Sequence, residues 1–368
     1  MSSDPAAELR DILRHYDLGE LTRLERNERG FVNASFAIDV VKDGKPARYF
    51  LRKYKRGIRQ EEIEFEHSVI ECLVKAGSPP VARLHATREG KTYLHRFAGA
   101  EDREGAFYAI FDFLPDDDRY TWVGPRCLPA EIRNSGIVQA QFHRALNGFV
   151  PRGQRAESKI LDLLSEMGQY LDGTPQRSKN TVFDACLMEH LQFLRRDLRE
   201  TLAVLGEPEA RRMPQLIIHC DYHPGNLKFR GAEVTGLFDF DWSKVDLRAF
   251  DVALALWYFF ATWEAEQDGE LRLADVAMYL AAYQSALAGQ PGLGPLSASE
   301  GRYLPHLINA ASHYVLNWTV LDYYNKDVDP QEYLTFLRHS LNFTRWFRAP
   351  GHLEGLRHII APLTAQAA

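Results

Sequence analysis

The sequence lacks the patterns that mark several common protein classes. Its four cysteines are widely scattered without a C-x-x-C pair, a spacing that fits neither a zinc site nor a small disulfide framework. No run reaches the roughly 18 apolar residues of a membrane span, and "VALALWYFFATW" is more typical of a buried helix. The N-terminal segment has no basic region followed by an apolar core, the pattern of a secretion signal. We therefore expect a cytoplasmic protein with reduced thiols and no membrane partner.

An excess of basic residues is also missing. The chain has 44 Lys and Arg against 50 Asp and Glu, which gives a net charge of -6 at pH 7. Broad nucleic-acid binding would favour a basic face, so we expect no nucleic-acid partner. A phosphate ligand remains compatible with this charge, because a few local donors suffice to hold it. The pattern G-x-x-x-x-G-K-[ST] is absent as well, which disfavours a P-loop enzyme.

The chain is long enough for two lobes, because its 368 residues exceed the usual size of one domain. Residues 31–54 contain two apolar runs joined by "KDGK", whose Asp-Gly pair favours a hairpin turn. Residues 59–77 have apolar side chains at near-helical spacing and end on a glycine. A strand-like run, "AFYAIFDFLP", ends at Pro115. From Ala130 onward the pattern is largely helical, and residues 217–242 are the exception.

That exceptional stretch reads "IIHCDYHPGNLKFRGAEVTGLFDFDW". A strand over Leu216–Ile218 would place Asp221 in the loop that follows it. The tight turn "HPGN" brings Asn226 round five residues later. A hairpin at "FRGAEV" and a returning strand over Val234–Phe238 then deliver Asp239. We expect the two strands to form a hairpin-linked platform that brings the three polar side chains together.

Two carboxylates and one amide in this order suit phosphoryl transfer from ATP. One carboxylate accepts or orients the proton of the attacking hydroxyl, and the other carboxylate and the amide oxygen hold Mg²⁺ against the phosphates. Magnesium prefers hard oxygen ligands and keeps several waters, so few protein ligands are needed. Asp241 is a further candidate ligand. Any single aspartate here would be typical of a turn or a helix cap.

A metal site built from His219, Asp221 and His223 is the rival interpretation. A His-x-x-x-His pair shares one face only on a helix, and Pro224 with Gly225 predicts a loop. We expect His219 to brace the loop through hydrogen bonds instead, and His223 to lie close to phosphate.

The stretch resembles a known family. "IIHCDYHPGNLKF" is similar to the H-x-D-x-x-x-x-N loop of the aminoglycoside phosphotransferase and choline kinase superfamily, and "GLFDFDWSKVDLRAFDVALAL" resembles its metal-binding segment. The resemblance implies an α+β, bilobal, protein-kinase-like fold with ATP and Mg²⁺ as cofactors. Residues 1–115 would form an antiparallel-sheet lobe with one main helix, and residues 116–368 a larger, mainly helical lobe. Asp221 would be the catalytic base, and Asn226 and Asp239 the metal ligands.

The strand that ends in "YFLRKY" supplies the expected cation for the nucleotide phosphates. Alternation along the strand places Arg52 and Lys53 on opposite faces. The superfamily usually carries Lys at this position and sometimes Arg; "FLR" aligns best with Arg52, and Lys53 is the alternative. Glu66, on the helix that follows, resembles the glutamate that positions this cation, with Glu62 one turn earlier as its alternative.

Two further segments resemble the family's nucleotide contacts. In "AFYAIFDFLP", Phe111 would lie behind the adenine, and the backbone of Asp112 and Leu114 would read its edge. The loop "NERGFVNASF" occupies the place of a loop that covers the nucleotide: Gly30 would permit close backbone approach, and Asn33 or Ser35 would bond to phosphate or hold the turn.

Within the superfamily the chain most resembles the bacterial homoserine kinases, through "YDLGELTRLERNERGFVNASFAI" and the metal-binding segment. The best expectation is therefore a kinase for the hydroxyl of homoserine or a similar amino alcohol. Phosphorylation of an aminoglycoside, a choline-like alcohol or a natural product is the alternative, and a non-catalytic nucleotide-binding module is a lower one. Homoserine is a zwitterion and needs a cation for its carboxylate; Lys244 and Arg248 are candidates, although a surface charge is the commoner role for each. We expect a monomer or homodimer.

Overall fold

The computed structural model describes residues 5–27, 33–97, 104–115, 117, 119–264 and 266–365. The chain divides into two compact units. The first contains residues 1–117 together with two short later segments, 150–155 and 235–238. The second contains the remaining residues from 118 to 368.

The first unit is built on an antiparallel sheet with the order β1-β2-β3-β6-β4, to which β5 adds by pairing with β6. Its strands are β1 (Glu20–Asn27), β2 (Ala34–Lys42), β3 (Lys45–Lys53), β4 (Leu84–His85), β5 (Leu94–Arg96) and β6 (Ala106–Asp112). The hairpin between β2 and β3 turns on Asp43 and Gly44, which have φ angles of 50° and 74°. Two consecutive residues with positive φ match the twist of paired strands, so the Asp-Gly signal is borne out.

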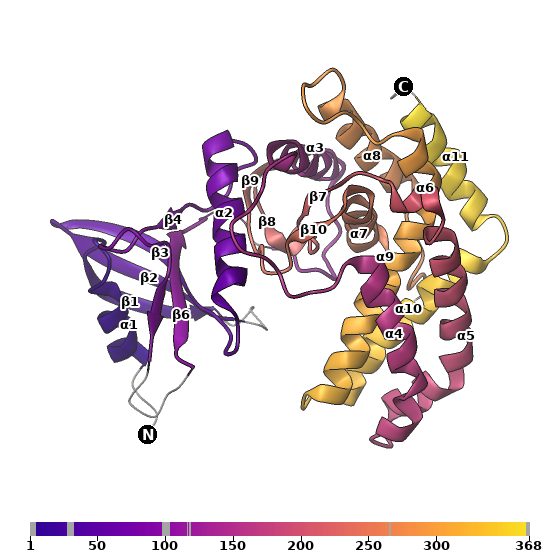
Figure 1. The fold of residues 1–368 in the computed structure, drawn as a ribbon, viewed down its shortest axis with the longest axis horizontal. Helices are drawn as coiled ribbons and strands as arrows, with labels where there is room; N and C mark the ends of the chain where they lie inside the picture. Colours follow the sequence, from indigo (N-terminus) through magenta and orange to yellow (C-terminus); the bar gives the residue numbers. More distant parts are fainter. Residues whose placement is uncertain are drawn as a thin grey trace. The chain divides into compact units, whose positions relative to one another are not determined.

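Two helices cover opposite faces of this sheet (Figure 1). Helix α1 (Pro5–Leu13) packs its apolar side chains against Ile38, Leu51 and Ile110. Helix α2 (Gln60–Ala76) ends at Gly77, which has a φ of 70° and donates its N–H to carbonyls of the last turn. That left-handed cap is why the glycine predicts the end of the helix.

The second unit is mainly helical, as the sequence predicts, and α4, α5, α9 and α10 pack along one another (Figure 1). Its helices are α3 (Pro129–Leu146), α4 (Ile160–Asp172), α5 (Val182–Leu205), α6 (Pro208–Arg211), α7 (Arg248–Phe260), α8 (Leu273–Leu287), α9 (Ala298–Asn325), α10 (Pro330–Arg348) and α11 (His352–Thr364). The expected α+β class is therefore confirmed. No helix among the described residues is long and apolar enough to cross a membrane.

Two small strand pairs hold the stretch that interrupts the helices. Strand β7 (Gln215–Ile218) pairs antiparallel with β10 (Lys244–Leu247), and β8 (Leu227–Arg230) pairs with β9 (Glu233–Leu237). The sequence predicts β7 and β9 but misses β10, whose four residues are too short to show a clear alternation. The expected single platform is therefore wrong, because the strands that precede Asp221 and Asp239 belong to different pairs.

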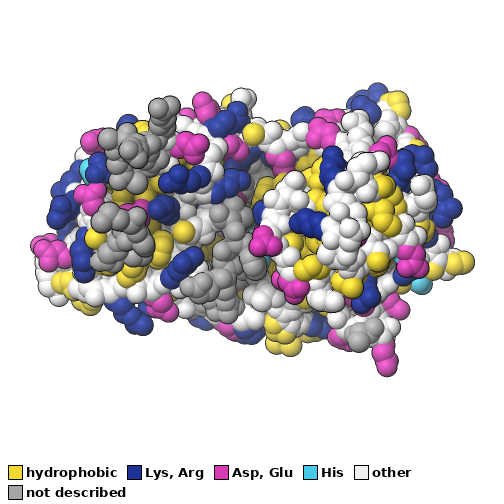
Figure 2. All heavy atoms as spheres, turned by 90° about the horizontal axis from the view of Figure 1, so that it is seen from below, with side chains coloured by type: hydrophobic (Ala, Val, Ile, Leu, Met, Phe, Trp, Pro, Cys, Tyr) yellow, Lys and Arg dark blue, Asp and Glu magenta, His cyan; other side chains and the backbone are white. Residues whose placement is uncertain are grey.

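Acidic and basic side chains are interspersed over the face that Figure 2 presents. This distribution agrees with the nearly balanced charge of the sequence.

Candidate active site

The loop after β7 carries the first candidate acid on a constrained backbone. Cys220 has a φ of 62°, a left-handed value that costs most non-glycine residues roughly 1–2 kcal/mol. Its backbone N–H donates to Asp251 Oδ1 over 2.7 Å, and Asp251 is fully buried on α7. Backbone strain of this kind persists only where the surroundings hold it, and it clusters at functional sites. The turn sets the direction in which Asp221 leaves the strand.

Asp221 has its carboxylate inside a ring of donors. Asn226 Nδ2 donates to its Oδ2 and to its backbone carbonyl, each over 2.9 Å. His223 Nε2 lies 3.6 Å from the same Oδ2, and the Tyr258 hydroxyl hydrogen-bonds to the carboxylate. Burial acts to raise the pKa of Asp221, but the charge and hydrogen bond of His223 and the bond from Asn226 outweigh it and lower the pKa. Asp221 is therefore ionised at neutral pH.

Asn226 is 5% exposed and ends a short 3-10 turn, Pro224–Asn226, before β8 begins. Because its amide nitrogen faces Asp221, the amide oxygen is the atom that it can offer to a cation. One hydrogen bond thus fixes both the carboxylate and the direction of the neighbouring oxygen.

Asp239 follows β9, and it also has a left-handed backbone, with a φ of 66°. The register of β7 with β10 pairs Ile218 with Lys244, so the loops around Asp221 and Asp239 leave the same end of this strand pair. The Phe240 ring lies 5.0 Å from the ring of His219. The two acidic segments are therefore packed together, although their strands are not paired with each other.

The donor set fits a divalent cation shared with phosphates. Asn226, Asp239 and the half-buried Asp241 offer amide and carboxylate oxygens, which are the hard ligands that Mg²⁺ takes. Within the described ranges, no group of three or more His, Cys, Asp or Glu could hold a metal ion by itself. The rival site of His219, Asp221 and His223 is thus not formed.

Asp251 braces the loop from beneath. Its Oδ2 lies 2.9 Å from His143 Nε2 and accepts from Gln139 Nε2 over 3.1 Å, both on α3. Burial lowers the pKa of His143 despite the opposing carboxylate, so the imidazole is neutral and donates from Nε2. Gln139 and His143 are contacts that the sequence gives no signal for, since they lie more than 100 residues from Asp251.

In the first unit, Arg52 and Glu66 form a buried pair. Arg52 Nη1 lies 3.1 Å from Glu66 Oε1, with side-chain exposures of 9% and 1%. The Tyr54 hydroxyl donates to Glu66 Oε2 over 3.0 Å and contacts His67 Nε2 at 2.9 Å. Glu62, the alternative to Glu66, instead caps the start of α2 through the backbone N–H of Arg59.

Lys53 points to the opposite face, as alternation predicts. Its Nζ lies 2.6 Å from Glu8 on α1. The structure therefore brings Arg52, and not Lys53, to the glutamate on α2.

The other predicted nucleotide contacts are placed as follows. Asn33 Oδ1 accepts from the backbone N–H of Lys55 over 2.9 Å, which ties the start of β2 to the end of β3. Ser35 is buried in β2 directly opposite Arg52. Gly30 lies outside the described residues.

The three predicted contacts with the base lie at the end of β6 and just beyond it. Phe111 is 6% exposed, and its ring lies 6.1 Å from that of His67 and 5.6 Å from the Arg52 guanidinium. The backbone N–H of Asp112 donates to Arg83, so only the carbonyl of Asp112 could read a base. Leu114 is half-buried two residues beyond the strand.

Lys244 and Arg248 are not surface charges. Lys244 is 3% exposed, and its Nζ lies 2.5 Å from Glu157 Oε2. Arg248 is 2% exposed and pairs with Glu300 at 2.5 Å. The interpretation of both cations as surface charges is therefore wrong. Lys244 begins β10 and Arg248 directly follows it, and the sequence pattern does not reveal this strand.

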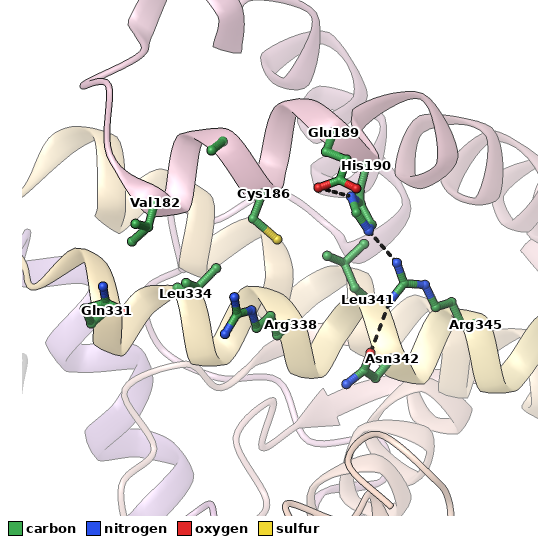
Figure 3. Close-up of a pocket in the computed structure, with 11 residues that line it drawn as sticks. Val182, Cys186, Glu189, His190, Gln331, Leu334, Arg338, Leu341, Asn342 and Arg345 are labelled. Atoms are coloured by element: carbon green, nitrogen blue, oxygen red, sulfur yellow. Dashed lines mark hydrogen bonds and ion pairs between the residues drawn. The ribbon is translucent and has the colours of Figure 1, made fainter. Parts of the chain in front are cut away.

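A cavity of about 620 Å³ lies elsewhere, between α5 and α10 (Figure 3). Arg338, Arg345 and His190 line it together with apolar side chains of both helices. None of the predicted site residues lines this cavity.

Comparisons with known proteins agree with this geometry. The model of the phosphotransferase enzyme family matches residues 23–289. A homoserine kinase of Rhodopseudomonas palustris is 29% identical over 350 residues, which cover 92% of this chain and 93% of that one. A homoserine kinase of Bradyrhizobium sp. is 28% identical over 346 residues, with coverages of 90% and 92%.

Solved structures share the fold. A microcompartment-associated aminopropanol kinase superposes with a TM-score of 0.66 at 16% identity, covering 94% of this chain and 98% of that one. An ethanolamine kinase of Plasmodium vivax has a TM-score of 0.58 at 14% identity, with coverages of 94% and 89%. The expected resemblance and kinase-like fold are confirmed, and the chain belongs to the phosphotransferase enzyme family.

Proposed function

We propose that this protein is a kinase that transfers the γ-phosphate of Mg·ATP to the hydroxyl of a small amino alcohol, with homoserine as the preferred candidate. The observation that carries the proposal is the contact between Asp221 and Asn226, which holds an ionised carboxylate beside an amide oxygen that can face a cation. The similarity to homoserine kinases over about nine tenths of the chain supports the choice of acceptor.

Asp221 would orient the acceptor hydroxyl and take its proton. The lowered pKa suits an ionised group that accepts a hydrogen bond from the hydroxyl. A positioned general base of this type typically contributes about 10²–10⁴-fold to the rate. The bonds from Asn226 and Tyr258 keep the carboxylate in one orientation.

Asn226, Asp239 and Asp241 would hold Mg²⁺, which neutralises charge that develops on the phosphates. Arg52 would bind the phosphates, because its guanidinium is the cation that Glu66 positions. Its planar fork suits a phosphate better than a point charge does. Phe111, Asp112 and Leu114 would contact the base.

The test is Asp221→Asn, with Asp162→Asn on an exposed position of α4 as the matched control. We expect at least a hundredfold loss of homoserine-dependent ATP consumption in the first variant and none in the second. Both variants should retain the shift in thermal unfolding that Mg·ATP causes. Activity of Asp221→Asn within tenfold of the parent would contradict the assigned role.

An acceptor panel tests the rest of the proposal. Turnover of homoserine above that of aminoglycosides and choline-like alcohols is the expected result. Binding of Mg·ATP without turnover of any acceptor would instead identify a nucleotide-binding module.

A further inference from the structure

A second charged pair lies at the end of the β7–β10 strand pair from which the loop of the candidate base leaves. Lys244 begins β10 opposite Ile218, the last residue of β7. Its Nζ donates to Glu157 Oε2 over 2.5 Å and to the carbonyl of Ser158 over 2.9 Å. Lys244 follows the proposed metal ligand Asp241 by three residues, whereas Glu157 belongs to the segment between α3 and α4.

Aromatic side chains connect this pair to the loop of Asp221. Lys244 Nζ lies 5.8 Å from the ring centre of Tyr314. The Tyr314 hydroxyl lies 3.5 Å from Cys220 Sγ, and Cys220 immediately precedes Asp221. The half-buried Trp318 continues the wall, 6.1 Å from Tyr314 between ring centres. The charges are thus linked through Tyr314 to the residue that precedes Asp221.

A second buried pair of the same unit, Arg248 with Glu300, serves as a comparison. Arg248 and Glu300 have side-chain exposures of 3% and 1%, and the guanidinium also donates to the carbonyls of Gly294 and Pro295. Glu157 is 16% exposed and lies in the irregular segment between α3 and α4. Lys244 is 4% exposed, so the two pairs differ in their carboxylates, and Glu157 is the more exposed of the two.

Stability alone is a weak reason for such a pair, because desolvation of two charges often cancels their attraction. A zwitterion can insert into the pair without leaving either charge uncompensated. Its carboxylate meets the lysine, its ammonium meets the glutamate, and each new contact is a charge-assisted hydrogen bond.

We propose that Lys244 and Glu157 form the subsite for the charged groups of a zwitterionic amino alcohol, with Lys244 taking the carboxylate and Glu157 the ammonium. This inference rests on the proposed kinase activity. It deepens that proposal by assigning the acceptor class to two residues of this chain.

The test compares three acceptors that differ by one charged group. Homoserine carries both charges, 3-aminopropan-1-ol lacks the carboxylate, and 4-hydroxybutanoate lacks the ammonium. For Lys244→Met we expect kcat/KM to fall about tenfold to hundredfold for homoserine and 4-hydroxybutanoate. This is the range for the loss of one charged hydrogen bond. The kcat/KM for 3-aminopropan-1-ol should stay within about threefold. For Glu157→Gln we expect the same fall in kcat/KM for homoserine and 3-aminopropan-1-ol, with 4-hydroxybutanoate within about threefold.

Glu300→Gln is the matched control, because it makes the same change in the sealed pair. It should lower stability and shift all three acceptors by the same factor. Equal losses for all three acceptors in Lys244→Met or Glu157→Gln would overturn the subsite, since a structural role predicts that result. If Lys244→Met does not fold, the Glu157→Gln variant alone tests the subsite. Glu157 lies in an irregular, partly exposed segment, so we expect this variant to fold. A parent protein that turns over none of the three acceptors would refute the proposed function itself, which is a different outcome.

Discussion

Replacement of Asp251 by Asn tests whether the buried brace beneath the loop governs both stability and turnover. The Asp251 carboxylate accepts three hydrogen bonds, from the backbone of Cys220, from His143 and from Gln139. An asparagine has one accepting oxygen, which can stay with Cys220. Its amide group would then face two former donors. His143 can change tautomer and accept a hydrogen bond from this amide. Gln139 could accept one only if its side-chain amide rotated to exchange its nitrogen and oxygen.

The expected cost follows from these bonds. A hydrogen bond to a charged group contributes about 1.5–3 kcal/mol, and Asp251→Asn loses one or two of them. We expect the free energy of unfolding to fall by about 3 kcal/mol, the sum for one to two such bonds. A domain of ordinary stability still folds after such a loss.

All six tryptophans lie in the second unit, so their fluorescence in a urea titration reports the unfolding of that unit. In the folded variant, kcat should fall at least tenfold, because misplacement of the loop moves Asp221. The KM for ATP should stay within about threefold, because Arg52 and Glu66 belong to the first unit.

Asp197→Asn is the matched control. Asp197 is a buried aspartate on α5 that bonds to His313 and Asn309, and also to the guanidinium of Arg348. This variant should lose similar stability and keep its kcat. A loss below 1 kcal/mol with unchanged kcat in Asp251→Asn would refute the reasoning.

Three further predictions concern the first unit. Arg52→Lys should raise the KM for ATP about tenfold without changing that of the acceptor, because the charge stays and the planar fork is lost; an unchanged KM in steady-state assays would exclude this role. Burial lowers the pKa of His67 from 6.5 to about 3, so the unfolded chain binds the extra proton between these values and stability falls as the pH drops below 6.5. From pH 7.5 to 5 this loss is on the order of 2 kcal/mol, and His67→Asn should flatten the pH dependence of urea unfolding. Gly153→Ala should cost about 2 kcal/mol in the same assay, because φ is 70° and the new Cβ would meet the carbonyl oxygen of Glu61 at 2.1 Å; a change below 0.5 kcal/mol would contradict the close approach.

Local signals account for much of the fold. The Asp43-Gly44 turn and the cap at Gly77 each require a left-handed backbone that few other residues accept, so the hairpin and the end of α2 are readable in the sequence. The order of Asp221, Asn226 and Asp239 likewise indicates the family, because phosphoryl transfer needs those oxygens.

Long-range partners could not be predicted in the same way. Strand β10 exists because β7 pairs with it, and a four-residue run has no periodicity of its own. Lys244 meets Glu157 across 87 residues, so nothing near either one reveals that they pair. Alternation places Arg52 and Lys53 on opposite faces of the strand, but it does not show that Arg52 meets Glu66 and Lys53 meets Glu8.

The left-handed backbones of Cys220 and Asp239 have a consequence for protein engineering. Glycine adopts such angles without strain, so Cys220→Gly and Asp239→Gly relieve the same local conflict. A selection for thermal tolerance alone would enrich glycine wherever this relief exceeds the loss of side-chain packing, and Cys220 is a buried residue that contacts Tyr314. Enrichment at position 239 would remove a proposed metal ligand, whereas enrichment at position 220 would leave every proposed catalytic group in place. Selection for heat resistance would therefore have to be coupled to a measurement of turnover, because relief of backbone strain at position 239 removes a carboxylate that the proposed chemistry requires.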